Sequence, residues 1–214
     1  MAIKAAIFDL DGTLVDSLAD IGGAMNHALE HHGLPAHPID AYRQFVGEGV
    51  HRLAEKALPP ARQDLKEPVL AEYRRYYAEH LLHATKPYPG IEALLDALSA
   101  RGVKLAVLSN KPDPATRTLV QHFFSRWPLV AVYGERPGVP RKPDPTAALE
   151  IAKAAGAAPS ECMFIGDSAI DMRTATAAGM LPVAVLWGLR ERAELEENGA
   201  RALVTHPEQI LALT

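Results

Sequence analysis

Five short apolar runs, separated by helical patterns, constrain the fold of this chain most strongly. Within each run the apolar residues follow one another without polar alternation, which is typical of parallel strands covered on both faces. The runs are residues 5–8, 105–108, 129–132, 163–165 and 183–186. Apolar residues at helical spacing occupy 91–98, 147–155 and 172–178, and a glycine closely follows each segment, as expected at a helix end. Alternating strands and helices predict an α/β fold with a doubly wound parallel sheet.

One region breaks this alternation. Residues 18–83 show helical patterns and no convincing strand, and an apolar stripe of Leu70, Tyr73, Tyr77 and Leu81 indicates core packing. The stretch closes with the proline-rich linker 86–90. We therefore predict a small α-helical domain at 16–85, inserted into a Rossmann-like core domain made of 1–15 and 86–214.

Composition and charge narrow the class of protein. Hydrophobic residues make up 48% and charged residues 22% of the 214 positions, which is typical of a soluble globular protein. The net charge of −4, without a dense Lys/Arg run, disfavours a nucleic-acid partner. No apolar stretch predicts a membrane span, and Asp9 comes too early for a secretory signal. The single Cys162 excludes an internal disulfide and fits a cytoplasmic location. A monomer and a homodimer both stay open.

Polar residues follow the apolar runs at the places where ligands bind in open α/β sheets, beyond the carboxyl ends of the strands. We expect these residues to converge at one edge of the sheet. They are Asp9, Leu10, Asp11, Gly12 and Thr13 after the first run, Ser109, Asn110 and Lys111 after the second, Asp167 and Asp171 after the fourth, and Lys142 ahead of the helix at 147–155.

This mixture of residue types points to phosphate chemistry. Carboxylates packed together need a cation, and an all-oxygen ligand set favours Mg2+. A lysine and a hydroxyl beside them suit a phosphate group. A carboxylate such as Asp9 can attack phosphorus and form an aspartyl phosphate, and a second carboxylate two residues on can exchange protons with the leaving oxygen and with water. Phosphoryl transfer depends mainly on positioning and charge neutralisation, which such a cluster supplies.

The same residues show that the chain resembles the haloacid dehalogenase-like superfamily over nearly its whole length. The DxDGT motif of that superfamily matches residues 9–13, and its strand-ending Ser or Thr matches Ser109. Its lysine ahead of a helix matches Lys142, and its acidic pair matches Asp167 and Asp171. All four motifs occur in order, each after an apolar run or ahead of a helix, which makes the resemblance highly specific.

The resemblance implies roles for the carboxylates. Asp9 is expected to be the nucleophile and a Mg2+ ligand. Asp11 is expected to be the general acid/base and to offer its backbone carbonyl to the metal. Asp167 completes the protein ligands, and Asp171 is expected to orient Lys142 or a metal-bound water.

The resemblance also implies a phosphate-binding set. Ser109 and Lys142 are expected to hold the transferring phosphoryl group, with Asn110 beside it. Backbone N–H groups around Leu10 and Gly12 are expected to help bind the phosphate. The ligand is then a small phosphorylated metabolite.

The helical insert resembles the C1-type cap of the superfamily, which closes over the substrate and excludes water. Four segments, 11–17, 46–50, 109–112 and 134–143, are similar to phosphoglycolate phosphatase-like members, so phosphoglycolate is the preferred substrate. In such a cap the turn at 47–49 faces the active site. This places Glu48, His51 and Arg52 as expected neighbours of the substrate.

Other readings of the same residues remain open. A phosphosugar mutase shares the fold, although Thr13 favours the phosphatase, and a non-catalytic binding protein is a third alternative, which the full set of motif residues disfavours. Asp11 disfavours a dehalogenase or a phosphonate hydrolase. His27, His31, His32 and His37 are interpreted as a solvated helix end rather than a metal site, and Ser168 and Asp144 as helix caps.

Overall fold

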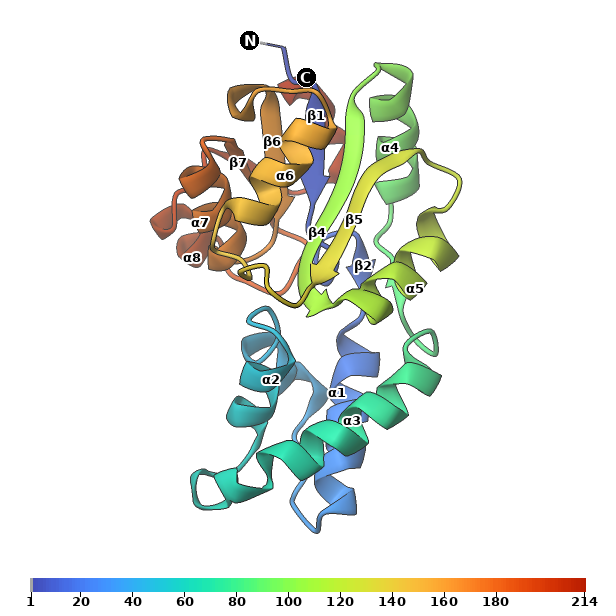
Figure 1. The fold of residues 1–214 in the computed structure, drawn as a ribbon, viewed down its shortest axis with the longest axis vertical. Helices are drawn as coiled ribbons and strands as arrows, with labels where there is room; N and C mark the ends of the chain where they lie inside the picture. Colours follow the sequence, from blue (N-terminus) through green and yellow to red (C-terminus); the bar gives the residue numbers. More distant parts are fainter. Residues whose placement is uncertain (1) are drawn as a thin grey trace.

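The computed structural model describes residues 2–214, and its core is a six-stranded parallel sheet (Figure 1). The strand order is β5-β4-β1-β6-β7-β8, so β1 occupies the centre and the chain winds outward from it on both sides. The strands are β1 (Ala5–Phe8), β4 (Lys104–Pro112), β5 (Leu129–Glu135), β6 (Cys162–Gly166), β7 (Leu181–Val185) and β8 (Ala202–Val204). The predicted α/β fold with a doubly wound parallel sheet is confirmed. Four of the five apolar runs lie wholly within a strand, and the fifth lies in β7 except for residue 186.

Helices cover both faces of the sheet because successive side chains of each strand point to opposite sides. Ala6 and Phe8 of β1 pack in one hydrophobic cluster with α4 (Ile91–Ala100) and α5 (Asp113–Phe124). Ala5 and Ile7 pack in a second cluster with α6 (Thr146–Ala154) and α7 (Ala169–Ala178). The short α8 (Arg192–Glu197) and the 3-10 segment Pro207–Leu213 complete the core domain. The central strands are thus buried on both faces, as their apolar sequences require.

A helical unit, hereafter the cap, lies at the carboxyl end of the sheet (Figure 1). It contains α1 (Leu18–His31), α2 (Val50–Ala57), α3 (Lys66–His80) and two 3-10 segments, Ile39–Gln44 and Pro60–Leu65. The chain enters and leaves it through a two-stranded antiparallel ribbon of β2 (Val15–Asp16) and β3 (Lys86–Pro87). This ribbon spans both predicted boundaries, and the exact division at 15/16 and 85/86 stays a prediction.

The two ends of the cap are tied together at one buried carboxylate. Asp20, in the first turn of α1, accepts hydrogen bonds from the backbone N–H groups of Ala84 and Thr85 at 2.8–3.0 Å. It also accepts one from Thr85 Oγ1 at 2.7 Å. Because an unpaired buried carboxylate is strongly unfavourable, these bonds fix where the cap returns to the core.

The aromatic stripe of α3 packs in the core of the cap. Leu70, Tyr73, Tyr77 and Leu81 are all buried, and the rings of Tyr73 and Tyr77 stack with centroids 5.3 Å apart. His27 stacks on Tyr76 and contacts Glu72 at 2.9 Å, which fits a helix-surface role for this histidine.

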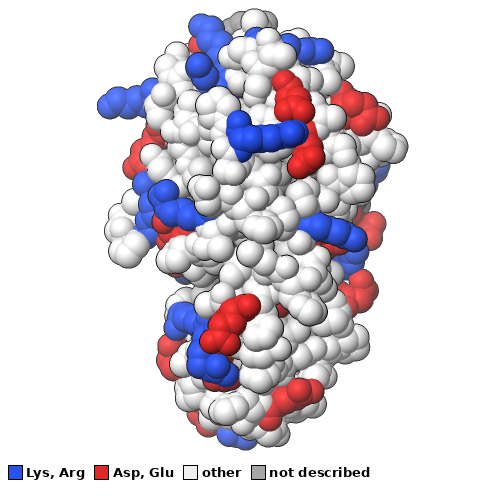
Figure 2. Space-filling view, turned by 90° about the vertical axis from the view of Figure 1, so that its right-hand side faces the viewer, with Lys and Arg blue, Asp and Glu red and all other residues white. Residues whose placement is uncertain are grey.

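Among the described residues, no helix is both long and apolar enough to cross a membrane. Lys and Arg side chains lie next to Asp and Glu over the face drawn in Figure 2.

Candidate active site

Neighbouring strands bring the predicted catalytic residues to one edge of the sheet. Asp9 directly follows β1, Asp167 directly follows β6, and Ser109 lies in the last part of β4. Lys142 reaches the same edge from the loop ahead of α6, and Asp171 from the first turn of α7. All five residues are buried. The convergence expected for residues that follow the apolar runs is therefore present at the centre of the sheet, where β1 lies between β4 and β6.

Three carboxylates form a compact buried cluster. One oxygen each of Asp9, Asp167 and Asp171 lies within 4.8 Å of the others. Burial raises the pKa of Asp9 to about 6, although the nearby Lys142 ammonium lowers it. Burial, reinforced by the charges of Asp171 and Asp9, raises the pKa of Asp167 to about 8. Such shifts indicate that the cluster needs more positive charge than the polypeptide supplies.

Lys142 contacts two of the three carboxylates. Its Nζ lies 3.0 Å from Asp9 Oδ1 and 2.7 Å from Asp171 Oδ1. Burial alone would lower the pKa of Lys142, but Asp171 and Asp9 outweigh it and raise that pKa to about 12. The second oxygen of Asp171 accepts hydrogen bonds from Ser168 Oγ at 2.6 Å and from Ser168 N at 3.1 Å. Asp171 is thus arranged to hold Lys142 in place, and Ser168 caps α7.

Asp167 is the carboxylate that no lysine or arginine neutralises by an ion pair among the described residues. Its Oδ1 accepts a hydrogen bond from Thr13 Oγ1 at 3.3 Å, and its Oδ2 accepts one from Leu189 N at 2.8 Å. With three carboxylates around a single ammonium, a further cation fits the cluster. The ligand atoms are all oxygen, a set that suits Mg2+. Asp9, Asp167 and the backbone carbonyl of Asp11 are the residues that would hold it.

Glycines let the backbone come close to Asp167. Gly12 has φ +82°, and a Cβ atom there would lie 2.2 Å from Asp167 Oδ2. A Cβ atom on Gly188 would lie 2.3 Å from Asp167 Cβ. Side chains at either position would displace the carboxylate, so the DxDGT turn needs glycine for both its conformation and its space.

The predicted phosphate-binding N–H groups already have partners inside the turn. Leu10 N donates to Asp9 Oδ1 at 2.7 Å, and Gly12 N donates to Val15 O at 3.0 Å. Their role toward phosphate stays a prediction that this arrangement does not support. The Leu10 bond instead fixes the orientation of the Asp9 carboxylate.

Asn110 joins three parts of the site. Its Oδ1 accepts from Lys142 N at 3.0 Å, and its Nδ2 donates to Lys142 O at 3.1 Å. The same Nδ2 donates to Gly47 O of the cap at 3.2 Å. The amide therefore positions the lysine loop and contacts the cap, while its predicted contact with substrate stays a prediction.

Asp11 faces a second buried lysine. Lys111 Nζ lies 2.9 Å from both carboxylate oxygens of Asp11, and Ser17 Oγ donates to Asp11 Oδ1 at 2.5 Å. The Lys111 side chain is 4% exposed, so this ion pair is almost completely withdrawn from water. In the sequence, Lys111 follows Ser109 and Asn110 after an apolar run that predicts a strand. This position indicated that Lys111 lies at the site.

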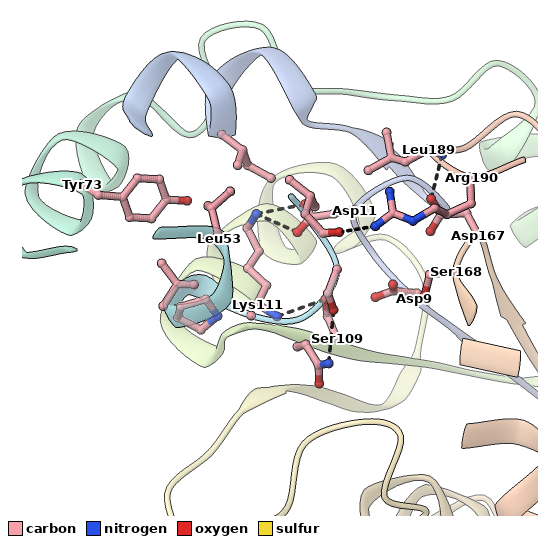
Figure 3. A pocket seen from close by; sticks show the side chains of 17 residues that line it. Asp9, Asp11, Leu53, Tyr73, Ser109, Lys111, Asp167, Ser168, Leu189 and Arg190 are labelled. Atoms are coloured by element: carbon pink, nitrogen blue, oxygen red, sulfur yellow. Dashed lines mark hydrogen bonds and ion pairs between the residues drawn. The ribbon is translucent and has the colours of Figure 1, made fainter. Parts of the chain in front are cut away.

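A cavity separates these core residues from the cap (Figure 3). Leu53 and Tyr73 reach in from the cap toward Lys111 and Asp11. The other cap residues that line the cavity are mostly apolar or glycine: Ile21, Val46, Gly47, Gly49 and Val50. The cap thus covers the carboxylates with a largely apolar roof, which suits exclusion of water.

Three predicted cap residues lie outside this lining. Glu48 Oε1 contacts Lys56 Nζ at 2.5 Å, Arg52 Nη1 donates to Glu55 Oε2 at 2.6 Å, and His51 Nε2 lies 3.3 Å from an Arg74 nitrogen. This arrangement does not support Glu48, His51 and Arg52 as substrate neighbours. The reason is geometric, because the turn presents its backbone at Gly47 and Gly49 to the cavity and directs these side chains elsewhere.

Arg190 is a site residue that the sequence analysis missed. It lies in the loop after β7 and lines the cavity. Its guanidinium donates to the backbone carbonyls of Arg43 and Val46 in the cap, the latter at 2.8 Å. The available signal was its position beyond the carboxyl end of a predicted strand.

The parallel sheet and the buried aspartates under a helical lid define an α/β enzyme with an aspartate-based active site. Residues 6–185 match the family model for haloacid dehalogenase-like hydrolases, and the chain belongs to this family.

Similar proteins cover nearly the same length. The phosphoglycolate phosphatase of Aquifex aeolicus is 34% identical over 187 residues, which cover 87% of this chain and 86% of that protein. The phosphoglycolate phosphatase of Rhodospirillum rubrum is 36% identical over 195 residues, covering 86% and 80%. A crystal structure from Lactobacillus delbrueckii subsp. bulgaricus superposes with a TM-score of 0.90 at 35% identity, covering 98% of this chain and 97% of that one.

Proposed function

We propose that this protein is a Mg2+-dependent phosphatase that hydrolyses 2-phosphoglycolate through an aspartyl-phosphate intermediate on Asp9. The observation that carries the proposal is the oriented Asp9 carboxylate at the cavity, flanked by Lys142 and by the unbalanced Asp167. The substrate follows from the similarity to proteins named phosphoglycolate phosphatase.

Asp9 is oriented for attack by contacts to one of its oxygens. Leu10 N, at 2.7 Å, and Lys142 Nζ, at 3.0 Å, both contact Oδ1. Oδ2 has no hydrogen-bond partner among the described residues, so it is the oxygen that attacks phosphorus. The new O–P bond forms as the bond from phosphorus to the ester oxygen breaks, and the phosphoryl group passes to Asp9.

Asp11 serves both halves of the reaction. In its protonated form it gives a proton to the departing ester oxygen, and as the resulting carboxylate it takes a proton from the water that attacks the aspartyl phosphate. Lys142 and Ser109 hold the phosphoryl oxygens, and the apolar roof of the cap keeps other water away. Mg2+, when bound, neutralises charge on the phosphoryl group.

A panel of small phosphomonoesters tests the proposal. Wild-type protein with Mg2+ should release inorganic phosphate most efficiently from 2-phosphoglycolate. Asp9→Asn should lower turnover by at least about a thousandfold, because an amide is a poor nucleophile, while the far-UV circular dichroism stays unchanged. The exposed Asp64→Asn is the matched control and should keep wild-type turnover.

The panel has two contrary outcomes. Near wild-type turnover in Asp9→Asn would refute the mechanism. Isomerisation of a sugar phosphate without phosphate release would favour a mutase instead.

Metal dependence is a separate prediction. Treatment with EDTA should remove activity, and added Mg2+ should restore it, because no lysine or arginine among the described residues forms an ion pair with Asp167. Full activity in the metal-free protein would refute the metal assignment.

Location and assembly complete the proposal. The buried Cys162 is an unreactive thiol, since burial raises its pKa to about 11, and a cytoplasmic enzyme with a free cysteine fits this chemistry. A monomer holds every residue of the proposed site, so assembly into a homodimer is not needed for it.

A further inference from the structure

Lys111 is a buried cation that the proposed mechanism does not use. Its ammonium contacts both oxygens of Asp11 at 2.9 Å and lies 4.8 Å from the centroid of the Tyr77 ring. Burying an ammonium group is costly unless an anion accompanies it, and here Asp11 is that anion. The chain therefore keeps a second positive charge at the cavity, on the cap side of the residue that protonates the leaving group.

The other cations at this site already have partners elsewhere. Lys142 lies between Asp9 and Asp171, at 3.0 and 2.7 Å. Arg190 donates to two cap carbonyls and lies 3.3 Å from Glu194. Among the described residues that line the cavity, Lys111 is the cation whose partner is a residue that must also serve the leaving group.

The position of Lys111 matches the shape of a short phosphorylated acid. In 2-phosphoglycolate a single methylene separates the ester oxygen from the carboxylate. When the ester oxygen lies at Asp11, the substrate carboxylate has to lie close to the Lys111 ammonium, which contacts Asp11. The cap residues on that side of the cavity, Leu53 and Tyr73, carry no charge. The ammonium of Lys111 is therefore the available partner of the substrate carboxylate.

We propose that Lys111 binds the carboxylate of the leaving group and makes the enzyme selective for phosphomonoesters that carry an anionic group one carbon from the ester oxygen. This inference rests on the proposed function and adds the residue that recognises the substrate. The three N–H donors of the ammonium allow it to contact both Asp11 and the substrate carboxylate. An ion pair formed under the apolar roof of the cap, away from bulk water, discriminates more strongly than one in water.

Selectivity is the quantity to measure. We would compare kcat/KM for 2-phosphoglycolate with kcat/KM for ethyl phosphate, which lacks the carboxylate, in wild type, Lys111→Gln and Lys111→Arg. Wild type should prefer 2-phosphoglycolate by about a hundredfold or more. Lys111→Gln should lose most of that ratio, whatever its effect on either substrate alone, and Lys111→Arg should keep more of it because the positive charge remains.

Two variants serve as controls. Lys153→Gln removes an exposed lysine on α6 and should keep the wild-type ratio. Arg190→Gln removes the other cation beside the cavity and should change both substrates alike, because its guanidinium contacts the cap backbone. If thermal unfolding shows that Lys111→Gln does not fold, Lys111→Met replaces it, because methionine fills the space of the lysine side chain without burying an amide. The same ratio of kcat/KM values is then measured in Lys111→Met.

The outcomes separate the two proposals. An unchanged substrate ratio in Lys111→Gln or Lys111→Met, with phosphate release intact in wild type, would overturn the role of Lys111 and leave the phosphatase proposal standing. If Arg190→Gln loses the preference for 2-phosphoglycolate and Lys111→Gln keeps it, the substrate carboxylate binds Arg190 instead, and the inference is overturned. Absence of phosphate release from either compound in wild type would refute the proposed function itself.

Discussion

At the residue scale, the site is defined by buried charge that the polypeptide does not balance. Lys142 pairs with both Asp9 and Asp171, whereas Asp167 receives hydrogen bonds from Thr13 and Leu189 and forms no ion pair with a lysine or arginine among the described residues. An anion held in this way raises the free energy of the folded state unless it takes up a proton or a metal ion. The arrangement therefore favours metal binding at the expense of metal-free stability.

This predicts how the stability of the metal-free protein depends on pH. The pKa of Asp167 is about 8 in the folded protein and near 3.8 when exposed, so the folded state binds more protons between these values. Stability must then fall as pH rises through this window. The pKa of Asp9 is about 6, so Asp167 dominates above that pH. We expect the melting temperature of EDTA-treated protein to fall between pH 6 and pH 8, and Asp167→Asn to lose much of this fall.

The comparison between variants isolates the contribution of Asp167 from that of every other group in the protein. Asp64→Asn, at an exposed carboxylate, is the matched control and should keep the wild-type slope. Mg2+ should raise the melting temperature more at pH 8 than at pH 6. Equal slopes in wild type and Asp167→Asn would contradict the assignment of the raised pKa to Asp167.

At the scale of the elements, the turn after β1 depends on close approach between backbone and side chain. Gly12 and Gly102 both have positive φ, +82° and +75°. Of these two glycines, only Gly12 would bring an added Cβ atom within 4 Å of a neighbour, and that neighbour is Asp167. Replacing each by alanine separates conformational strain from steric clash.

We expect Gly102→Ala to lower the free energy of unfolding by about 1 kcal/mol, from strain alone. Gly12→Ala should cost about 3 kcal/mol or more, because the clash with Asp167 adds to the strain. It should also weaken the activation by Mg2+. Chemical denaturation and Mg2+ titration of activity measure the two effects, and equal destabilisation by both variants would show that the clash is relieved without cost.

At the scale of the whole molecule, reciprocal contacts hold the cap against the core. Arg190 donates to the carbonyls of Arg43 and Val46, and Arg43 in turn donates to Gly188 O at 3.1 Å. Asn110 donates to Gly47 O. Leu189, next to Arg190, contacts Asp167, so cap contact and the carboxylate cluster share one loop.

We predict that Arg190→Gln loosens this closure. For every phosphomonoester KM should rise and kcat should fall, so that kcat/KM drops by roughly tenfold. The reason is that the closed cap excludes water and completes the site. Limited proteolysis within residues 43–49 should become faster. Arg192→Gln, which removes an exposed arginine paired with Glu196, is the control and should behave as wild type. Unchanged kinetics in Arg190→Gln would mean that these bonds do not govern closure.

Much of the core was predictable from local pattern, since buried parallel strands carry uninterrupted apolar runs. The strand β8 was missed because three residues, Ala202–Val204, hold too little pattern, and the ribbon of β2 and β3 was missed because each strand has only two residues. Such elements depend on a partner strand rather than on their own sequence.

The sequence by itself determined the α/β core and the positions of Asp9, Asp11, Ser109, Lys142 and Asp167 at the carboxyl edge, because each follows an apolar run or precedes a helical segment. Only the tertiary structure decided which charges pair: Lys142 with Asp9 and Asp171, Lys111 with Asp11. It also placed Glu48, His51 and Arg52 outside the cavity and Arg190 beside it. Local patterns report periodicity and burial, whereas the partner of a buried charge depends on distances between segments far apart in the chain.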